Sequence, residues 1–143
     1  MQVISRLIHA FWLGSGAFLI FVAAPAAFRS SSNPTAAANV VGAMLSRWHY
    51  IALTAPLILL ALEWRRARVA VLSIIFAAIV LAAAQVMIDM RIRSIRAKSP
   101  VPISELSRQD PLRRQFGLLH GVSSLLLLGQ VVAAAAAIVA HER

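Results

Sequence analysis

Four long apolar segments dominate this sequence and constrain its fold more than any other feature. They run over residues 7–28, about 39–62, 69–90 and 116–140, the second being strictly apolar only from Tyr50 onward. A helix of about 20 apolar residues is long enough to cross a bilayer, and each segment reaches that length. The sequence therefore predicts an all-α, polytopic membrane protein, a four-transmembrane-helix antiparallel bundle.

The composition supports this class. The chain has 143 residues, of which 60% are hydrophobic and 13% charged. A soluble domain of this length buries only about two thirds of its unfolded surface, so the remaining apolar surface needs lipid or partner subunits. There are no cysteines, which excludes disulfides, thiolate metal sites and cysteine nucleophiles.

In a membrane protein the excess of basic residues is explained by contact with lipid. The formal net charge is +9, and the arginines flank the apolar segments. Their expected partners are anionic lipid headgroups of the bilayer. No nucleic-acid partner is expected, because no basic stripe with interleaved aromatic residues is present.

The chain is predicted to form one domain over residues 1–143. Helix-start signals indicate where its helices begin. Asn33 before Pro34, and Asp110 before Pro111, are each typical of an N-cap followed by the first helical residue. Pro56 lies inside the second helix and predicts a kink there. The expected helices cover residues of about 4–28, 35–64, 67–95 and 111–141.

Four spans place both termini on one side of the membrane. Five basic residues lie with the termini and the short connection at 63–68, and nine lie with the other two connections. The positive-inside rule then predicts that the nine face the cytoplasm and that both termini lie outside it. The predicted location is the bacterial inner (cytoplasmic) membrane, multi-pass.

A carboxylate near the end of the third segment must face something other than lipid. Gln85, Asp89 and Arg93 are spaced four residues apart and therefore share one helix face. An ionised carboxylate facing hydrocarbon costs about 2.5–3.5 kcal/mol even on the lenient insertion scale. We therefore expect Asp89 to turn inward, toward a histidine or an arginine.

Two histidines are expected at a similar depth. His49 follows Arg47 by two residues in the second segment, and His120 lies near the start of the fourth, with Ser123 below it. Three antiparallel helices then bring His49, Asp89 and His120 to one end of the bundle. The candidate polar or ion-binding residues are His49, Gln85, Asp89, Arg93, His120 and Ser123.

Several interpretations of these residues stay open. They can form an Asp–His pair that relays a proton or holds a cation. They can equally form a structural ion pair, Asp89 with Arg93 or Arg47, that fixes the helix ends, or make contact with lipid. His49, His120 and Asp89 also have ligand types that suit zinc or copper, although no spacing motif supports a metal site.

The opposite end of the bundle offers fewer candidates. His9 is a candidate contact for haem or another cofactor, and His141 is the one histidine available there as a second ligand. The sequence itself requires no cofactor. The glutamates Glu63, Glu105 and Glu142 are expected in loops or at the termini. No catalytic set is evident, so we do not expect an enzyme.

The order of these features resembles the transmembrane-protein-205-like family, known in bacteria as the domain of unknown function 4149. The resemblance covers almost the whole chain. The matching stretches are "HAFWLGSGAFLIFVAAPAAF" (9–28), "VGAMLSRWHYIALTAPLILLAL" (41–62), "QVMIDMRIRSIR" (85–96) and "FGLLHGVSSLLLLGQ" (116–130). The residues on family-like positions are His9, Trp12, Gly14, Asp89, His120 and Ser123. The fourth helix departs from the family pattern, which has an asparagine soon after the histidine and serine, whereas the nearest amide here is Gln130.

The resemblance implies a four-helix inner-membrane bundle without assigned biochemistry. The first expected function is an accessory or scaffold subunit associated with a larger membrane complex. The second is a small transporter, or a metal- or proton-handling protein, that uses the His/Asp site and forms a homo-oligomer. The third is a haem- or pigment-contacting redox subunit.

Overall fold

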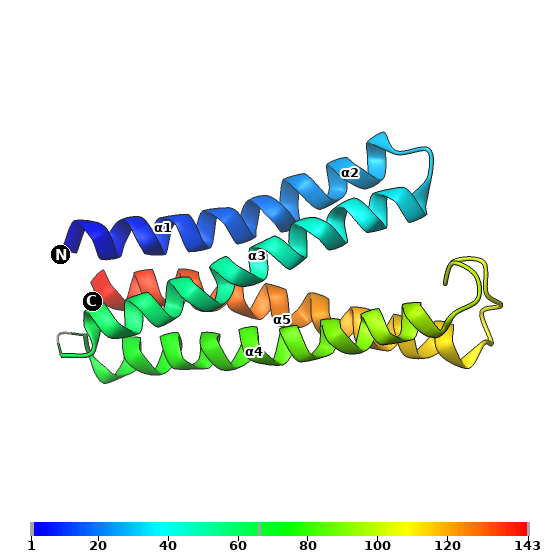
Figure 1. Cartoon of the computed structure of the whole chain (residues 1–143). Helices are drawn as coiled ribbons and strands as arrows, with labels where there is room; N and C mark the ends of the chain where they lie inside the picture. The colour runs from blue at the N-terminus through cyan, green and yellow to red at the C-terminus, as the bar shows by residue number, and fades with distance from the viewer. Residues whose placement is uncertain (1, 66, 143) are drawn as a thin grey trace.

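A computed structural model describes residues 2–65 and 67–142. Within these residues, four helical rods long and apolar enough to cross a membrane lie alongside one another (Figure 1). This arrangement confirms the predicted helical membrane bundle. The elements are α1 (Gln2–Phe18), η1 (Leu19–Ala23), α2 (Ala24–Ser30), α3 (Pro34–Glu63), α4 (Val69–Lys98) and α5 (Pro111–Glu142).

The first rod covers the range predicted for the first helix, about 4–28, and is irregular in its second half. It contains a π-helical turn, η1, and the Ala24 backbone N–H donates to the carbonyl of Leu19, five residues back. Pro25 follows this turn, has no backbone N–H, and its ring would crowd the carbonyl of Phe21 in a regular α-helix. The wider turn relieves that crowding, as single π turns inside helices commonly do.

The predicted helix starts are confirmed at two caps. The Asn33 side chain accepts hydrogen bonds from the backbone N–H groups of Thr35 (2.9 Å) and Ala36 (3.3 Å). The Asp110 side chain accepts from the backbone N–H of Leu112 at 2.8 Å. Each cap satisfies donors that have no partner within the helix. At its far end α4 continues to Lys98, three residues beyond the predicted end at residue 95.

Small residues let the rods pack closely at the centre. Alanines of α3, α4 and α5 are fully buried there, as expected for helix contacts in membranes. Gly16 is an extreme case, because a Cβ at this position would lie 2.9 Å from the Trp48 ring and 2.8 Å from a Val131 methyl group. The Trp48 indole N–H donates to Ser15 Oγ at 3.2 Å, which ties α1 to α3.

The two ends of the bundle differ in how closely the helices approach one another. Both ends of the chain and the α3–α4 connection lie at one end of the bundle, which we name the terminal end (Figure 1). The α2–α3 and α4–α5 connections lie at the other, the loop end. There α2 and the start of α3 diverge from α4 and α5, which remain the most extensively packed pair. This divergence leaves space between the two halves.

Candidate functional site

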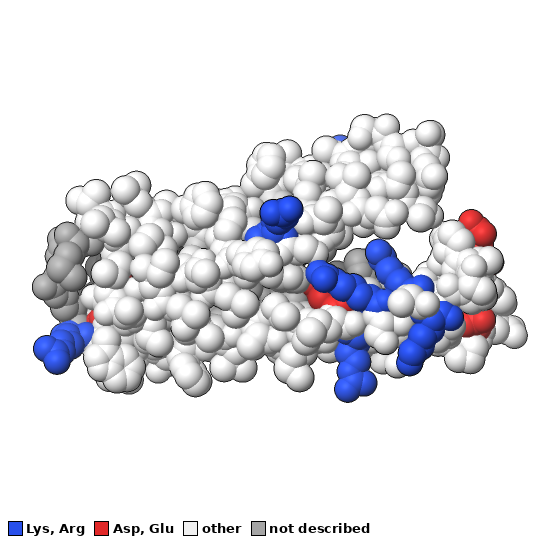
Figure 2. Space-filling view, in the orientation of Figure 1, with Lys and Arg blue, Asp and Glu red and all other residues white. Residues whose placement is uncertain are grey.

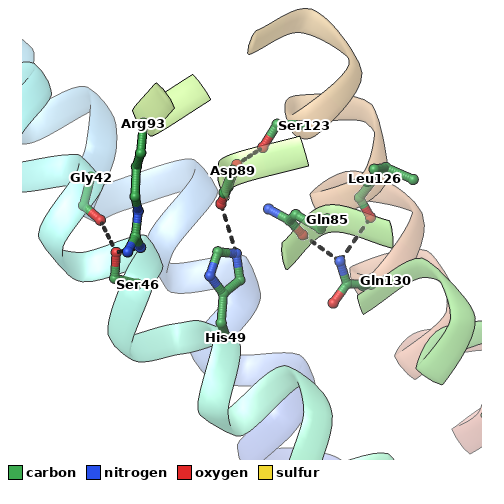
Figure 3. A network of polar contacts seen from close by, with 9 residues as sticks. All are labelled: Gly42, Ser46, His49, Gln85, Asp89, Arg93, Ser123, Leu126 and Gln130. Carbon is green, nitrogen blue, oxygen red and sulfur yellow. Dashed lines mark hydrogen bonds and ion pairs between the residues drawn. The ribbon is translucent and has the colours of Figure 1, made fainter. Parts of the chain in front are cut away.

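One carboxylate joins three helices in the half of the bundle nearer the loop end. His49 Nε2 of α3 lies 3.0 Å from Asp89 Oδ2 of α4, and Ser123 of α5 donates to Asp89 Oδ1 at 2.8 Å (Figure 3). The side chains of His49 and Asp89 are only 10% and 17% exposed. Asp89 therefore points into the bundle, toward the predicted His49 and Ser123.

The His49–Asp89 contact is an ion-pair contact rather than an aligned hydrogen bond. The Nε2 atom is buried and has no hydrogen-bond partner among the described residues, although the carboxylate oxygen lies within 3.0 Å. A small rotation of the imidazole ring would align the N–H with the oxygen. The pair can thus exist as carboxylate and imidazolium or as two neutral groups, which differ only in where the proton resides.

Arg93, one turn beyond Asp89, takes a different partner. Its Nη2 group donates to Ser46 Oγ at 2.7 Å, and Ser46 in turn donates to the carbonyl of Gly42 at 2.9 Å (Figure 3). Among the described residues, the ion-pair partner found for Asp89 is His49. Ser46, which connects Arg93 to α3, was not among the predicted candidates.

One turn before Asp89, two amides meet across α4 and α5. Gln130 donates through Nε2 to Gln85 Oε1 and, at 3.2 Å, to the carbonyl of Leu126 (Figure 3). Both glutamine side chains are fully buried. The Gln85 amide nitrogen and the Gln130 amide oxygen have no partner within the described part of the chain. A pair of amides with spare hydrogen-bonding capacity thus borders the site, at the cost of burying polar groups.

His120 does not join the Asp89 group. It is exposed, and its ring stacks on Phe116 with 5.8 Å between ring centroids. The guanidinium of Arg96 lies 5.2 Å from the centroid of the same Phe116 ring on the α4–α5 face. The predicted grouping of His49, Asp89 and His120 is therefore reduced to the pair of His49 and Asp89, while His120 stacks on Phe116.

The Asp89 group borders a cavity of about 410 Å³ between α3 and the α4–α5 pair. Phe28 of α2 also reaches its wall. Figure 2 shows a hollow at the loop end, with Lys and Arg side chains gathered around it. The charged and polar residues that line the cavity include Ser46, Asp89, Arg93, Arg96, His120 and Ser123.

A second polar cluster lies at the terminal end, where the sequence predicted His9 and His141 but not Glu63. Glu63 is the last residue of α3 and only 5% exposed, so its predicted place in a loop is wrong. Its carboxylate accepts from Ser5 Oγ of α1, and His141 of α5 donates to its Oε2 at 2.6 Å. Glu63 therefore connects three helices, as Asp89 does at the other site.

His9 borders this second cluster. Its Nδ1 lies 3.1 Å from the carbonyl of Ser5 and 4.0 Å from Glu63 Oε1. Its ring meets the ring of His141 edge-on, with 5.6 Å between centroids. Since the rings are in contact, no haem plane fits between them, and this pair is not placed as two axial ligands.

The proposed metal ligands are also not brought together. Within residues 2–65 and 67–142, no group of three or more His, Cys, Asp or Glu side chains is placed to hold a metal ion. His49 and Asp89 are adjacent, but His120 stacks on Phe116 instead of completing a ligand set.

Comparison with known proteins adds the family. Residues 7–100 match the family model described as a domain of unknown function, DUF4149. This match confirms the predicted resemblance to the bacterial domain of unknown function 4149 from α1 to the end of α4, and the stretch quoted for the fourth helix (116–130) lies outside it. No curated protein and no solved structure matches the chain.

Proposed function

This chain belongs to the DUF4149 family, whose description assigns no function, and we propose that it is a small membrane transporter that handles protons. The observation that carries the proposal is the half-buried Asp89 carboxylate, which lies between His49 and Ser123 at the wall of a cavity. An ionisable group at this depth is costly and commonly marks a proton or ion pathway.

The chemistry of the pair supports a proton rather than a metal ion as the species that it handles. His49 Nε2 lies 3.0 Å from the Asp89 carboxylate, so the two groups are close enough to share a proton. Two arginines, Arg93 and Arg96, line the same cavity and disfavour a free metal cation there. A purely structural contact would be served as well by apolar side chains, because burying an ion pair often gives no net stability.

Proton uptake into liposomes tests this proposal. The purified chain is reconstituted with a pH-sensitive dye inside, and a pH gradient is imposed. We expect uptake above that of empty liposomes, and we expect Asp89→Asn to lose at least about tenfold of it, since the amide cannot take up the proton. Glu105→Gln, which removes an exposed carboxylate of the α4–α5 connection, should retain the wild-type rate. Equal rates for wild type and Asp89→Asn would contradict the proposal.

The accessory-subunit function stays a second candidate, supported by glycines on the outer surface. Gly117 and Gly121 are exposed on α5, and a Cβ at either position would meet no atom within 4 Å. Two small residues four positions apart allow a helix of another subunit, or of a second copy, to approach closely.

Purification in a mild detergent tests the accessory role. We expect the wild-type chain to elute as a species larger than one chain, and the doubly substituted Gly117→Leu/Gly121→Leu chain to elute alone because leucines block the helix contact. Mass spectrometry identifies any companion. Elution of the wild type as a single chain would exclude a stable complex under these conditions.

A further inference from the structure

We infer that the cavity beside Asp89 binds the headgroup of an anionic phospholipid, with Arg93 and Arg96 on the phosphate. The inference deepens the proposed function by naming the class of molecule that the cavity takes. It rests on the proposed function only in that both assign a role to the same cavity, and lipid binding is tested separately from proton uptake. Three properties of the cavity indicate this ligand: the charge of its lining, the apolar part of its wall and its position in the bundle.

The charge of the lining favours an anion. Arg93 and Arg96 contribute two guanidinium groups, and Asp89 contributes the one carboxylate among the lining residues. His49 lies 3.0 Å from that carboxylate, and Ser123 donates to its other oxygen, so both Asp89 oxygens already have partners. The arginines are thus left with an excess of positive charge toward the cavity.

Both arginines keep hydrogen-bond donors to spare. A guanidinium carries five N–H groups in a fork that matches two phosphate oxygens. Arg93 uses Nη2 for Ser46, and the Arg96 guanidinium carbon lies over the Phe116 ring, 5.2 Å from its centroid. They are three residues apart on α4 and so lie on neighbouring positions of one helix surface.

The rest of the wall suits an acyl chain rather than a soluble phosphate. Apolar side chains line the cavity from each direction, among them Phe28 of α2, Leu45 of α3 and Leu127 of α5. Residues of α2, α3, α4 and α5 line the cavity, at the end of the bundle where α2 and the start of α3 diverge from α4 and α5 (Figure 1). A lipid can therefore place its headgroup at the arginines and one chain along these residues. Basic pockets between membrane helices are known to hold anionic headgroups in this way.

Lipid binding by the full chain tests the inference. The protein in nonionic detergent is titrated with phosphatidylglycerol or phosphatidylcholine, and bound lipid is counted by native mass spectrometry. We expect one phosphatidylglycerol to bind more tightly than phosphatidylcholine. Arg93→Gln/Arg96→Gln should weaken phosphatidylglycerol binding by about fivefold for each arginine, and so by about twenty-fivefold together. The matched control Arg65→Gln/Arg68→Gln removes the same charge at the terminal end and should bind as the wild type does.

A second pair of variants leaves every charge in place. Gly42 lines the cavity and has open space where a Cβ would point, so Gly42→Leu should fill the cavity and reduce phosphatidylglycerol binding at least about fivefold. Gly14 also has open space but lies outside the cavity lining, and Gly14→Leu should bind normally. The pair reports on the cavity even if the arginine variant fails to fold.

Three results would overturn the inference. They are equal affinity for the two lipids, equal loss in the control arginine variant, and displacement of phosphatidylglycerol by soluble glycerol phosphate at the same concentration. The last result would assign the arginines to a soluble phosphate compound instead. Absence of proton uptake together with selective phosphatidylglycerol binding would defeat the proposed proton handling and leave this inference standing.

Discussion

Replacing His49 by leucine is expected to destabilise the folded chain by about 1–3 kcal/mol, the usual cost of leaving a shielded polar group without one of its partners. The carboxylate of Asp89 would keep only the hydrogen bond from Ser123, while its side chain stays 17% exposed inside the bundle. Leucine also carries no proton that it could share with the Asp89 carboxylate. Unfolding in mixed micelles with increasing SDS measures the loss.

The paired substitution separates a structural contact from an unpaired charge. His49→Leu/Asp89→Leu removes both groups, and we expect this chain to be more stable than His49→Leu alone, because no charge is left unpaired. Tyr50→Leu, next to His49 but 70% exposed, is the control and should change stability by less than about 0.5 kcal/mol. Equal losses in the single and double variants would show that Asp89 is solvated without His49.

Much of the fold follows from local rules that operate within a few residues. Apolar length predicted four spans, and Asn33 and Asp110 marked helix starts within one residue of those observed. The cost of a carboxylate in lipid likewise predicted that Asp89 faces inward. These inferences needed only the period of the α-helix and the free-energy cost of placing a charge in lipid, and both rules can be applied to the sequence alone.

The position of His120 depended on packing that the sequence does not contain. His120 lies seven residues before Leu127 and three before Ser123, which are both buried, so the helix period places it on the same face. His120 is nevertheless exposed, at the end of the bundle where α2 and the start of α3 diverge from α4 and α5 (Figure 1). Periodicity gives the direction of a side chain but not whether a neighbouring helix is present.

The terminal-end cluster was missed for a related reason. Glu63 begins the charged stretch "EWRRAR", which on its own suggests a solvated connection. A signal was nevertheless present, because four antiparallel spans bring His9, Glu63 and His141 to the same end. A carboxylate within reach of two histidines from other helices has partners that justify its burial.

The second large effect is expected at this cluster. Glu63→Leu should destabilise the chain by about 3 kcal/mol, since it removes hydrogen bonds from Ser5 and His141 to a buried carboxylate, each worth about 1.5–3 kcal/mol. The His141 side chain is 39% exposed, so water can replace part of its hydrogen bond. The expected loss of stability therefore lies at the lower end of the summed range. Because Glu63 connects α1 and α5 to α3, the loss should be local as well as global.

Hydrogen–deuterium exchange in detergent locates the effect. In Glu63→Leu we expect faster exchange over the first turns of α1 and the last turns of α5, with the amides around Asp89 and Gln130 less affected. Glu105→Leu makes the same chemical change at an exposed position and should leave both helix ends protected. Unchanged exchange at both ends in Glu63→Leu would mean that apolar packing alone holds α1 and α5 there, and that the buried carboxylate contributes no net attachment. A loss confined to α5 would instead assign the attachment to His141 and leave the Ser5 hydrogen bond without energetic weight.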